Sequence, residues 1–181
     1  MDLNDKTFNG EIGDVIRLTE AFQEKKFIQI AEDIHQHQGI KMVLISGPSS
    51  SGKTTTCKRI SVQLALLGYH PVQISVDDFF VERDETPKDA NGEFDFESID
   101  AIDLKLFNET LSSIMEGKEV ALPTFDFSTG HKVWNEKKTV KMSDNAILII
   151  EGIHCLNPKL TDSIPDEVKY KIFVSALTSI S

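Results

Sequence analysis

Four short hydrophobic runs are spaced along the chain and separated by stretches in which polar and apolar residues mix. They are rich in leucine, aromatic or β-branched residues and only four or five residues long, which favours buried strands. The predicted strands are Met42–Ile45, Val72–Val76, Ile147–Ile150 and Tyr170–Val174. Because helical patterns alternate with these runs, the sequence predicts an α/β fold with a parallel sheet and helices on both faces.

Three segments have the spacing of amphipathic helices. The first is predicted to begin after Thr19 as its cap and to stop at Gly39, and the others cover Lys53–Leu67 and Ala101–Met115. The apolar residues assigned to these helices include Phe22, Phe27, Ile28, Ile30, Ala31 and Ile34 in the first, and Ile60, Val62, Leu64 and Leu66 in the second. Residues 1–40 are therefore interpreted as a lead-in helix and linker, and residues 41–181 as the main domain.

Two further segments have turn chemistry. Residues 82–100 are polar and contain Thr-Pro and Asn-Gly steps, which indicates a long excursion of the kind that often carries function. Residues 123–142 mix aromatic and alternating residues around Gly130 and predict a small hairpin, with Lys137, Lys138 and Lys141 on its solvated face.

Composition narrows the class of protein. The chain has 181 residues and a formal net charge of −10, which argues against a general binder of nucleic acids or anionic membranes. Its longest strongly apolar run, Ala146–Ile150, is too short to span a bilayer, and the N-terminus lacks a signal-peptide pattern. Its two cysteines cannot form a disulfide framework or a four-ligand zinc site. A soluble protein of the reducing cytoplasm is expected.

The strongest motif is Gly47–Thr54, which fits G-x-x-x-x-G-K-[ST] between a predicted strand and a predicted helix. Glycines let the backbone curl so that its N–H groups and the helix N-terminus point at phosphate oxygens. Lys53 can reach the β- and γ-phosphates, and the Thr54 hydroxyl can ligate Mg²⁺. The alternative is a glycine turn with an incidental lysine. The predicted nucleotide-binding residues are Gly47, Ser49, Ser50, Ser51, Gly52, Lys53, Thr54 and Thr55.

Carboxylates follow two other strands, at the sheet edge where ligands of parallel sheets bind. Glu151 ends the run Ile147–Ile150 in the manner of a Walker-B acid and can hold Mg²⁺, although a solvated acid would look the same. Asp77 and Asp78 follow Val72–Val76. One of them can accept a proton from an attacking hydroxyl, while the alternative is a turn or helix cap.

These motifs, taken in order, resemble those of the uridine kinase-like P-loop kinases, which belong with the phosphoribulokinases. The resemblance covers residues 41–174 and rests on the motifs Gly47–Thr54, Ser75–Phe80, Phe94–Glu97, Leu122–Phe127 and Ile150–Gly152. It implies a P-loop kinase domain over residues 41–181, a nucleoside as small-molecule partner, and ATP and Mg²⁺ as cofactors. It is closest to the kinase part of larger bacterial nucleoside kinases with added N-terminal domains.

The resemblance also implies roles for individual residues. Asp77 is the general base for the nucleoside 5′-hydroxyl, Lys53 acts on the phosphates, and Thr54, Glu151 and Asp77 place Mg²⁺. The residues implied in substrate binding are Asp78, Phe80, Phe96 and Glu97, then Phe125, Phe127 and His131. Without the resemblance, core packing is the favoured interpretation of the phenylalanines.

Three departures from the family pattern keep other functions open. Phe125 stands where uridine kinases often have a tyrosine, His131 is one residue out of step, and no arginine follows Arg83. The sequence ends before the family's arginine-rich lid and last strand, so a fragment with poor turnover is expected. Two alternatives stay open. One is a kinase for another small hydroxyl compound, such as a sugar phosphate or a pantothenate-like molecule, and the other is a non-catalytic ATP-binding module. The sequence does not decide the oligomeric state.

Overall fold

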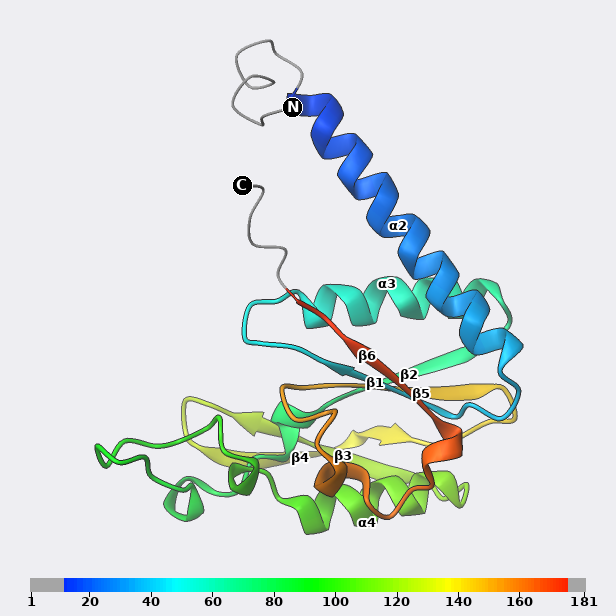
Figure 1. The fold of residues 1–181 in the computed structure, drawn as a ribbon. Helices are drawn as coiled ribbons and strands as arrows, with labels where there is room; N and C mark the ends of the chain where they lie inside the picture. The colour runs from blue at the N-terminus through cyan, green and yellow to red at the C-terminus, as the bar shows by residue number, and fades with distance from the viewer. Residues whose placement is uncertain (1–11, 176–181) are drawn as a thin grey trace.

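The computed structural model describes residues 12–175 and contains a four-stranded parallel sheet in the order β2-β5-β1-β6 (Figure 1). The strands are β1 (Met42–Ser46), β2 (His70–Ser75), β5 (Ala146–Glu151) and β6 (Lys169–Phe173). All four predicted strands are confirmed within two residues at each end.

Helices cover both faces of the sheet, as predicted. Helices α2 (Ile12–Gln36) and α3 (Lys53–Leu66) lie on one side, and α4 (Leu104–Met115) lies on the other (Figure 1). Successive residues of a strand point to opposite faces, so β1 and β5 supply both cores. The core beside α2 and α3 takes Val43, Ile45, Ile147 and Ile149, whereas that beside α4 takes Met42, Leu44, Leu148 and Ile150. The α/β class is therefore confirmed.

The N-terminal helix differs from the prediction. Thr19 lies inside α2, where its Oγ1 donates to the Val15 carbonyl at 2.8 Å, so it is not a cap. Only the end of α2 nearest the sheet reaches the core, through Ala31 and Ile34. Phe22 and Ile28 were predicted to face a core but are 60% and 39% exposed. Phe22 lies on the part of the helix that extends beyond the sheet (Figure 1), whereas Ile28 lies between Phe27 and Ile30, which pack against the core, and faces away from it.

The other two helices agree more closely with their patterns. In α3, Ile60 and Leu64 are buried, but Val62 and Leu66 are 57% and 77% exposed because they face away from the sheet. Helix α4 begins at Leu104 rather than Ala101, since the Asp103 side chain caps it by accepting from the Leu106 backbone N–H at 3.0 Å.

The predicted hairpin is present as strands β3 (Val120–Asp126) and β4 (His131–Val140), which pair in antiparallel fashion. It packs on the α4 side of the sheet (Figure 1). The excursion after β2 is built of short 3₁₀ turns and irregular backbone. The 3₁₀ turns of the chain are Val76–Phe79, Arg83–Glu85, Ile99–Ala101, Pro158–Thr161 and Asp166–Val168. Across residues 12–175, none of the helices is both long enough and apolar enough to traverse a bilayer.

Candidate functional site

The predicted phosphate loop joins β1 to α3 and has the backbone that its glycines predict. Gly52, the residue before the helix, has a φ of +88°, and Ser50 has a φ of +60°, a conformation that costs a non-glycine residue about 1–3 kcal/mol. A Cβ at Gly47 would lie 2.3 Å from the Val174 carbonyl oxygen. The close approach to the end of β6 therefore requires glycine at position 47. Because the first N–H groups of a helix have no partner within it, those of α3 are left facing the loop.

The side chains of the loop fit a bound triphosphate. Lys53 Nζ donates to the Pro48 carbonyl at 2.8 Å, so the ammonium group folds over the loop. The Ser51 hydroxyl is buried and has no hydrogen-bond partner among the described residues. Such an orphaned group is costly unless a ligand or water completes it, and a phosphate oxygen is a suitable acceptor.

Glu151 lies between the loop and the turn that carries Asp77. Its Oε1 accepts from Thr54 Oγ1 at 3.4 Å and from Ser75 Oγ at 3.3 Å. Ser75 is paired with Glu151 across β2 and β5, and Asp77 follows in the 3₁₀ turn Val76–Phe79. The strand that precedes Asp77 is not the neighbour of β1, because β5 separates the two. The order along this edge is therefore loop, Glu151, Asp77.

The electrostatics of this edge are unfavourable to negative charge. Desolvation raises the pKa of Asp77 even though part of its side chain is open to solvent, Lys53 opposes that rise, and Asp78 adds to it. Desolvation also raises the pKa of Glu151, and the Asp77 carboxylate raises it further. Perturbed carboxylates gathered beside a lysine are typical of functional sites.

The oxygen atoms at this edge suit a hard cation. Thr54, Glu151 and Asp77 offer hydroxyl and carboxylate oxygens, the donors that Mg²⁺ prefers. Within residues 12–175 there is no group of three or more His, Cys, Asp or Glu side chains arranged to hold a metal by themselves. Magnesium beside a nucleotide commonly takes only one or two protein ligands and completes its shell with phosphates and water, so the donor set fits.

These raised pKa values predict a gain in stability when charge is removed. A carboxylate with a raised pKa binds more protons in the folded than in the unfolded state, so its stability contribution falls as the pH rises above its ordinary pKa. In the ligand-free protein at pH 7, Glu151→Gln is expected to raise the thermal midpoint by about 1–3 °C. Glu82, whose pKa is lowered by its hydrogen bond to His131, is the matched control, since Glu82→Gln should lower the midpoint. Equal shifts in the same direction would contradict this account.

The predicted substrate phenylalanines form one cluster around Phe80. Its ring centroid lies 5.3 Å from that of Phe96, 5.4 Å from that of Phe125 and 5.8 Å from that of Phe127. Phe80 and Phe125 are each 5% exposed, whereas Phe127 is 61% exposed. The cluster therefore joins the core at one end and presents an aromatic surface at the other.

The polar residues predicted beside this cluster have different surroundings. Glu97 is exposed, and its backbone N–H donates to Asp95 Oδ1 at 3.1 Å. His131 Nδ1 lies 2.8 Å from Glu82 Oε2, and Asp78 Oδ2 accepts from Lys138 Nζ at 3.0 Å. Lys137 and Lys141 are exposed, as predicted for a solvated face, whereas Lys138 is only partly exposed and is paired with Asp78. No motif marks Lys138 or Glu82, and only the folded hairpin brings them to the site.

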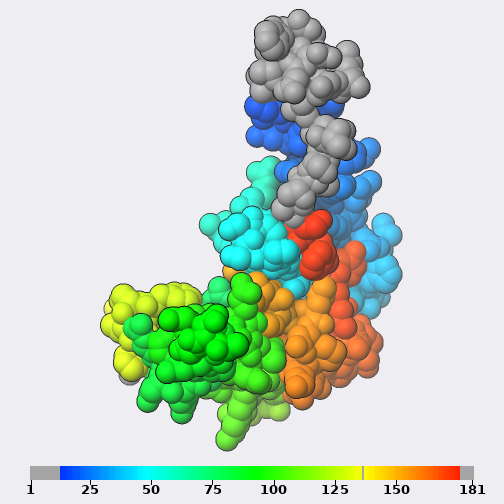
Figure 2. All heavy atoms as spheres, turned by 60° about the vertical axis from the view of Figure 1, so that its left-hand side comes forward, coloured from blue at the N-terminus to red at the C-terminus, as the bar shows by residue number. Residues whose placement is uncertain are grey.

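A recess is visible in the space-filling view of the molecule. Figure 2 shows it between the cyan atoms of the phosphate loop and α3 and the green and yellow atoms of the excursion and hairpin. The predicted phosphate-binding residues and the predicted substrate-binding residues of the hairpin therefore come from segments on opposite sides of one recess.

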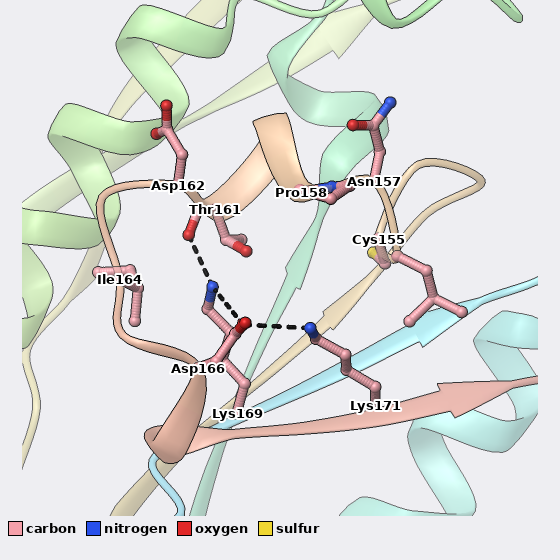
Figure 3. Close-up of a pocket in the computed structure, with 10 residues that line it drawn as sticks. Cys155, Asn157, Pro158, Thr161, Asp162, Ile164, Asp166, Lys169 and Lys171 are labelled. Atoms are coloured by element: carbon pink, nitrogen blue, oxygen red, sulfur yellow. Dashed lines mark hydrogen bonds and ion pairs between the residues drawn. The ribbon is translucent and has the colours of Figure 1, made fainter.

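A separate pocket lies beside β6 and contains none of the predicted site residues (Figure 3). It has a volume of about 250 Å³ and is lined in part by Cys155 and Thr161. The ammonium groups of Lys169 and Lys171 both contact Asp166 Oδ1, at 3.2 and 3.1 Å, and Lys169 also donates to the Thr161 carbonyl at 2.8 Å. Its two lysines share the Asp166 carboxylate, and none of the residues of the phosphate loop lines it, so the recess stays the candidate site.

Comparison with known proteins decides the family. The profile of the phosphoribulokinase/uridine kinase family matches residues 42–181, which include the phosphate loop, the carboxylates and the hairpin. The chain belongs to this family. The predicted resemblance is thereby confirmed for the phosphoribulokinase/uridine kinase group.

Individual members of the phosphoribulokinase/uridine kinase family show how far the likeness extends. The chain is 31% identical over 154 residues to uridine-cytidine kinase 2-B of Danio rerio and 30% identical over 129 residues to uridine kinase of Schizosaccharomyces pombe. It covers 56% and 27% of these relatives, so it spans about half or less of their length. A solved structure described as a possible uridine kinase from Bacillus stearothermophilus has a TM-score of 0.64 at 21% identity, over 82% of this chain and 79% of that one, which shows the shared fold.

Proposed function

We propose that the protein transfers the γ-phosphoryl group of ATP to a hydroxyl group of a nucleoside. The observation that carries this proposal is the meeting of Lys53, Thr54, Glu151 and Asp77 at one edge of the sheet. A phosphate-binding lysine, magnesium-type oxygen donors and a carboxylate that can orient the attacking hydroxyl are the parts that phosphoryl transfer needs.

The phosphate loop would hold the donor. Its backbone N–H groups and the N-terminus of α3 would face the phosphates, and the Lys53 ammonium would turn from Pro48 to the β- and γ-phosphates. Thr54 and Glu151 would hold Mg²⁺. When bound, the metal supplies positive charge that stabilises the negative charge developing on the phosphates.

Asp77 would accept the proton of the attacking hydroxyl. The bond from the acceptor oxygen to the γ-phosphorus forms, the bond to the ADP oxygen breaks, and the hydroxyl proton passes to the Asp77 carboxylate. A pKa raised by desolvation makes this carboxylate a stronger base than an ordinary aspartate. The Lys53 ammonium beside it favours the ionised form and limits this rise in pKa.

The aromatic cluster would bind the acceptor. The exposed ring of Phe127 offers a surface for stacking a base, and Glu97 is free to accept hydrogen bonds from the two ribose hydroxyls. The relatives named uridine-cytidine kinase and uridine kinase support a pyrimidine ribonucleoside as the acceptor. We take its 5′-hydroxyl as the attacking group, as the family resemblance implies.

A second candidate is a kinase for another small hydroxyl compound. Two of the residues implied in base binding offer little polar recognition, since Phe125 is buried without a hydroxyl and His131 is paired with Glu82. A sugar phosphate or a pantothenate-like molecule would not need polar contacts at these positions.

A panel of acceptors separates these functions. We expect ADP formation from Mg·ATP to rise at least about tenfold with uridine or cytidine over the rate without acceptor, and to stop when magnesium is chelated. A response only to a sugar phosphate or to pantothenate would favour the second candidate. ATP binding with no acceptor-dependent ADP would contradict both and indicate a nucleotide-binding module.

A further inference from the structure

The hairpin contains an irregularity directly beside the proposed acceptor site. Pro123 is paired with Trp134 and Ala121 with Thr139, so β4 advances five residues while β3 advances two. The extra residues form a large bulge, which Asn135 closes by accepting from the Lys137 backbone N–H at 3.0 Å. Bulges next to active sites commonly redirect a side chain, and this one ends at Lys138.

The redirected side chain of Lys138 contacts two other elements at once. Its Nζ lies 3.0 Å from Asp78 Oδ2, 2.9 Å from Thr124 Oγ1 and 3.2 Å from the Pro123 carbonyl. An ammonium group has three donors, and here each has an acceptor. The other carboxylate oxygen of Asp78 accepts a long bond, 3.4 Å, from the Phe125 backbone N–H.

These contacts join the two halves of the proposed site. Asp78 adjoins Asp77 in the turn Val76–Phe79, and Thr124 and Phe125 belong to the strand that bears the aromatic cluster. The side chains of Lys138 and Asp78 are 41% and 27% exposed, so their ion pair is only partly shielded from water. Partly exposed ion pairs contribute little to stability, so the main effect expected of this pair is on the relative positions of the two elements it joins.

We infer that Lys138 is a positioning residue for acceptor phosphorylation. It holds the strand of Phe125 at a fixed distance from Asp78, and thereby sets where the acceptor hydroxyl lies relative to Asp77. This inference rests on the proposed function and deepens it. A displacement of about 1 Å between reacting groups can cost about 10²-fold in rate, so a modest loosening of this link has a measurable effect.

The matched variants are Lys138→Met and Lys137→Met. Both remove one positive charge from the same bulge, but the Lys137 side chain has no hydrogen bond or ion pair with any described residue. With uridine as the probe, we expect Lys138→Met to lower kcat/KM for the acceptor about 10–100-fold, with most of the loss in kcat. The KM for ATP should stay within about twofold, because the phosphate loop is untouched, and Lys137→Met should leave kcat/KM for uridine and the KM for ATP within the same limit.

Two further readouts separate positioning from a merely structural role. Amide hydrogen exchange at Val76–Phe80 and Val120–Asp126 should be about threefold or more faster in Lys138→Met than in Lys137→Met, with similar thermal midpoints. The loss in Lys138→Met combined with Asp78→Asn should be smaller than the product of the two single losses, because the two changes share the Lys138–Asp78 contact while Asp78 also has a separate bond to the Phe125 N–H.

The exchange rates test the link made by Lys138, and the uridine kinetics test its effect on the acceptor. Equal exchange in the two lysine variants would overturn the link itself. Faster exchange with an unchanged kcat/KM for uridine would overturn its role in positioning. A wild-type protein without acceptor-dependent turnover would refute the proposed function, and the exchange measurement would still decide whether Lys138 joins the two elements.

Discussion

Replacing Asp77 with Asn is expected to lower acceptor-dependent ADP formation by about 10²–10⁴-fold. Asparagine keeps the shape of the side chain but cannot take the proton of the attacking hydroxyl. The loss should fall on kcat, because the phosphate loop and the aromatic cluster are unchanged. ATP binding should be equal or slightly tighter, since one of the carboxylates near the γ-phosphate position has lost its charge.

The control for this variant is Asp84→Asn. Asp84 is an exposed aspartate on the excursion, and its side chain has no hydrogen bond or ion pair with any described residue. It should turn over like the unmodified protein in steady-state assays with saturating Mg·ATP. If Asp77→Asn keeps more than about a tenth of the activity of Asp84→Asn, Asp77 is not the base.

Replacing Lys53 with Met is the change with the second largest expected effect. The methionine fills similar space but removes the cation that faces the phosphates, and one electrostatic contact to the transferring group is commonly worth about 10²–10³-fold in kcat. The loss of Lys53 should also raise the pKa of Asp77 further, since that ammonium now holds it down. The acid limb of the pH–rate profile should therefore move to higher pH.

Lys58→Met tests whether any lysine of α3 would have this effect. Lys58 is exposed on the same helix, and its side chain makes no hydrogen bond or ion pair within residues 12–175. Its replacement should change neither kcat nor the pH profile. Similar rates for the Lys53 and Lys58 variants would mean that the loop does not hold the triphosphate as proposed.

Much of this arrangement could be predicted from local signals. The loop needs glycine at positions 47 and 52 because of a close approach and a positive φ, and both demands are visible in the motif. Asp77 and Glu151 follow buried hydrophobic runs, and parallel strands bring such positions to one edge. The glycine requirements of the loop and the rule that parallel strands end at one sheet edge were sufficient to predict the half of the site formed by the loop, Glu151 and Asp77.

Other features depend on contacts between segments far apart in the chain. The order of strands, with β5 between β1 and β2, is set by packing of the whole sheet. The exposure of Phe22 follows from the length of α2 beyond the sheet, which an apolar residue at helical spacing cannot reveal. The contact of Lys138 with Asp78 needs a bulge that no short pattern encodes.

The surroundings of the aromatic residues could be predicted from the sequence only in part. Core packing, the interpretation favoured by the residues alone, describes Phe80 and Phe125, which are buried. It does not describe Phe127, whose ring is exposed at the edge of the same cluster. Alternation along a strand would put Phe125 and Phe127 on the same face, because they are two residues apart. Phe127 does not follow that pattern, since it lies beyond the end of β3.

The central claim concerns the distance between Asp77 and the reacting atoms. A crystal structure with a non-hydrolysable ATP analogue, Mg²⁺ and uridine measures it directly. The account predicts phosphates within the loop 47–54, and an Asp77 carboxylate oxygen about 2.6–3.2 Å from the uridine 5′-hydroxyl. Phosphates bound elsewhere, or an Asp77 side chain turned away from that hydroxyl, would contradict it.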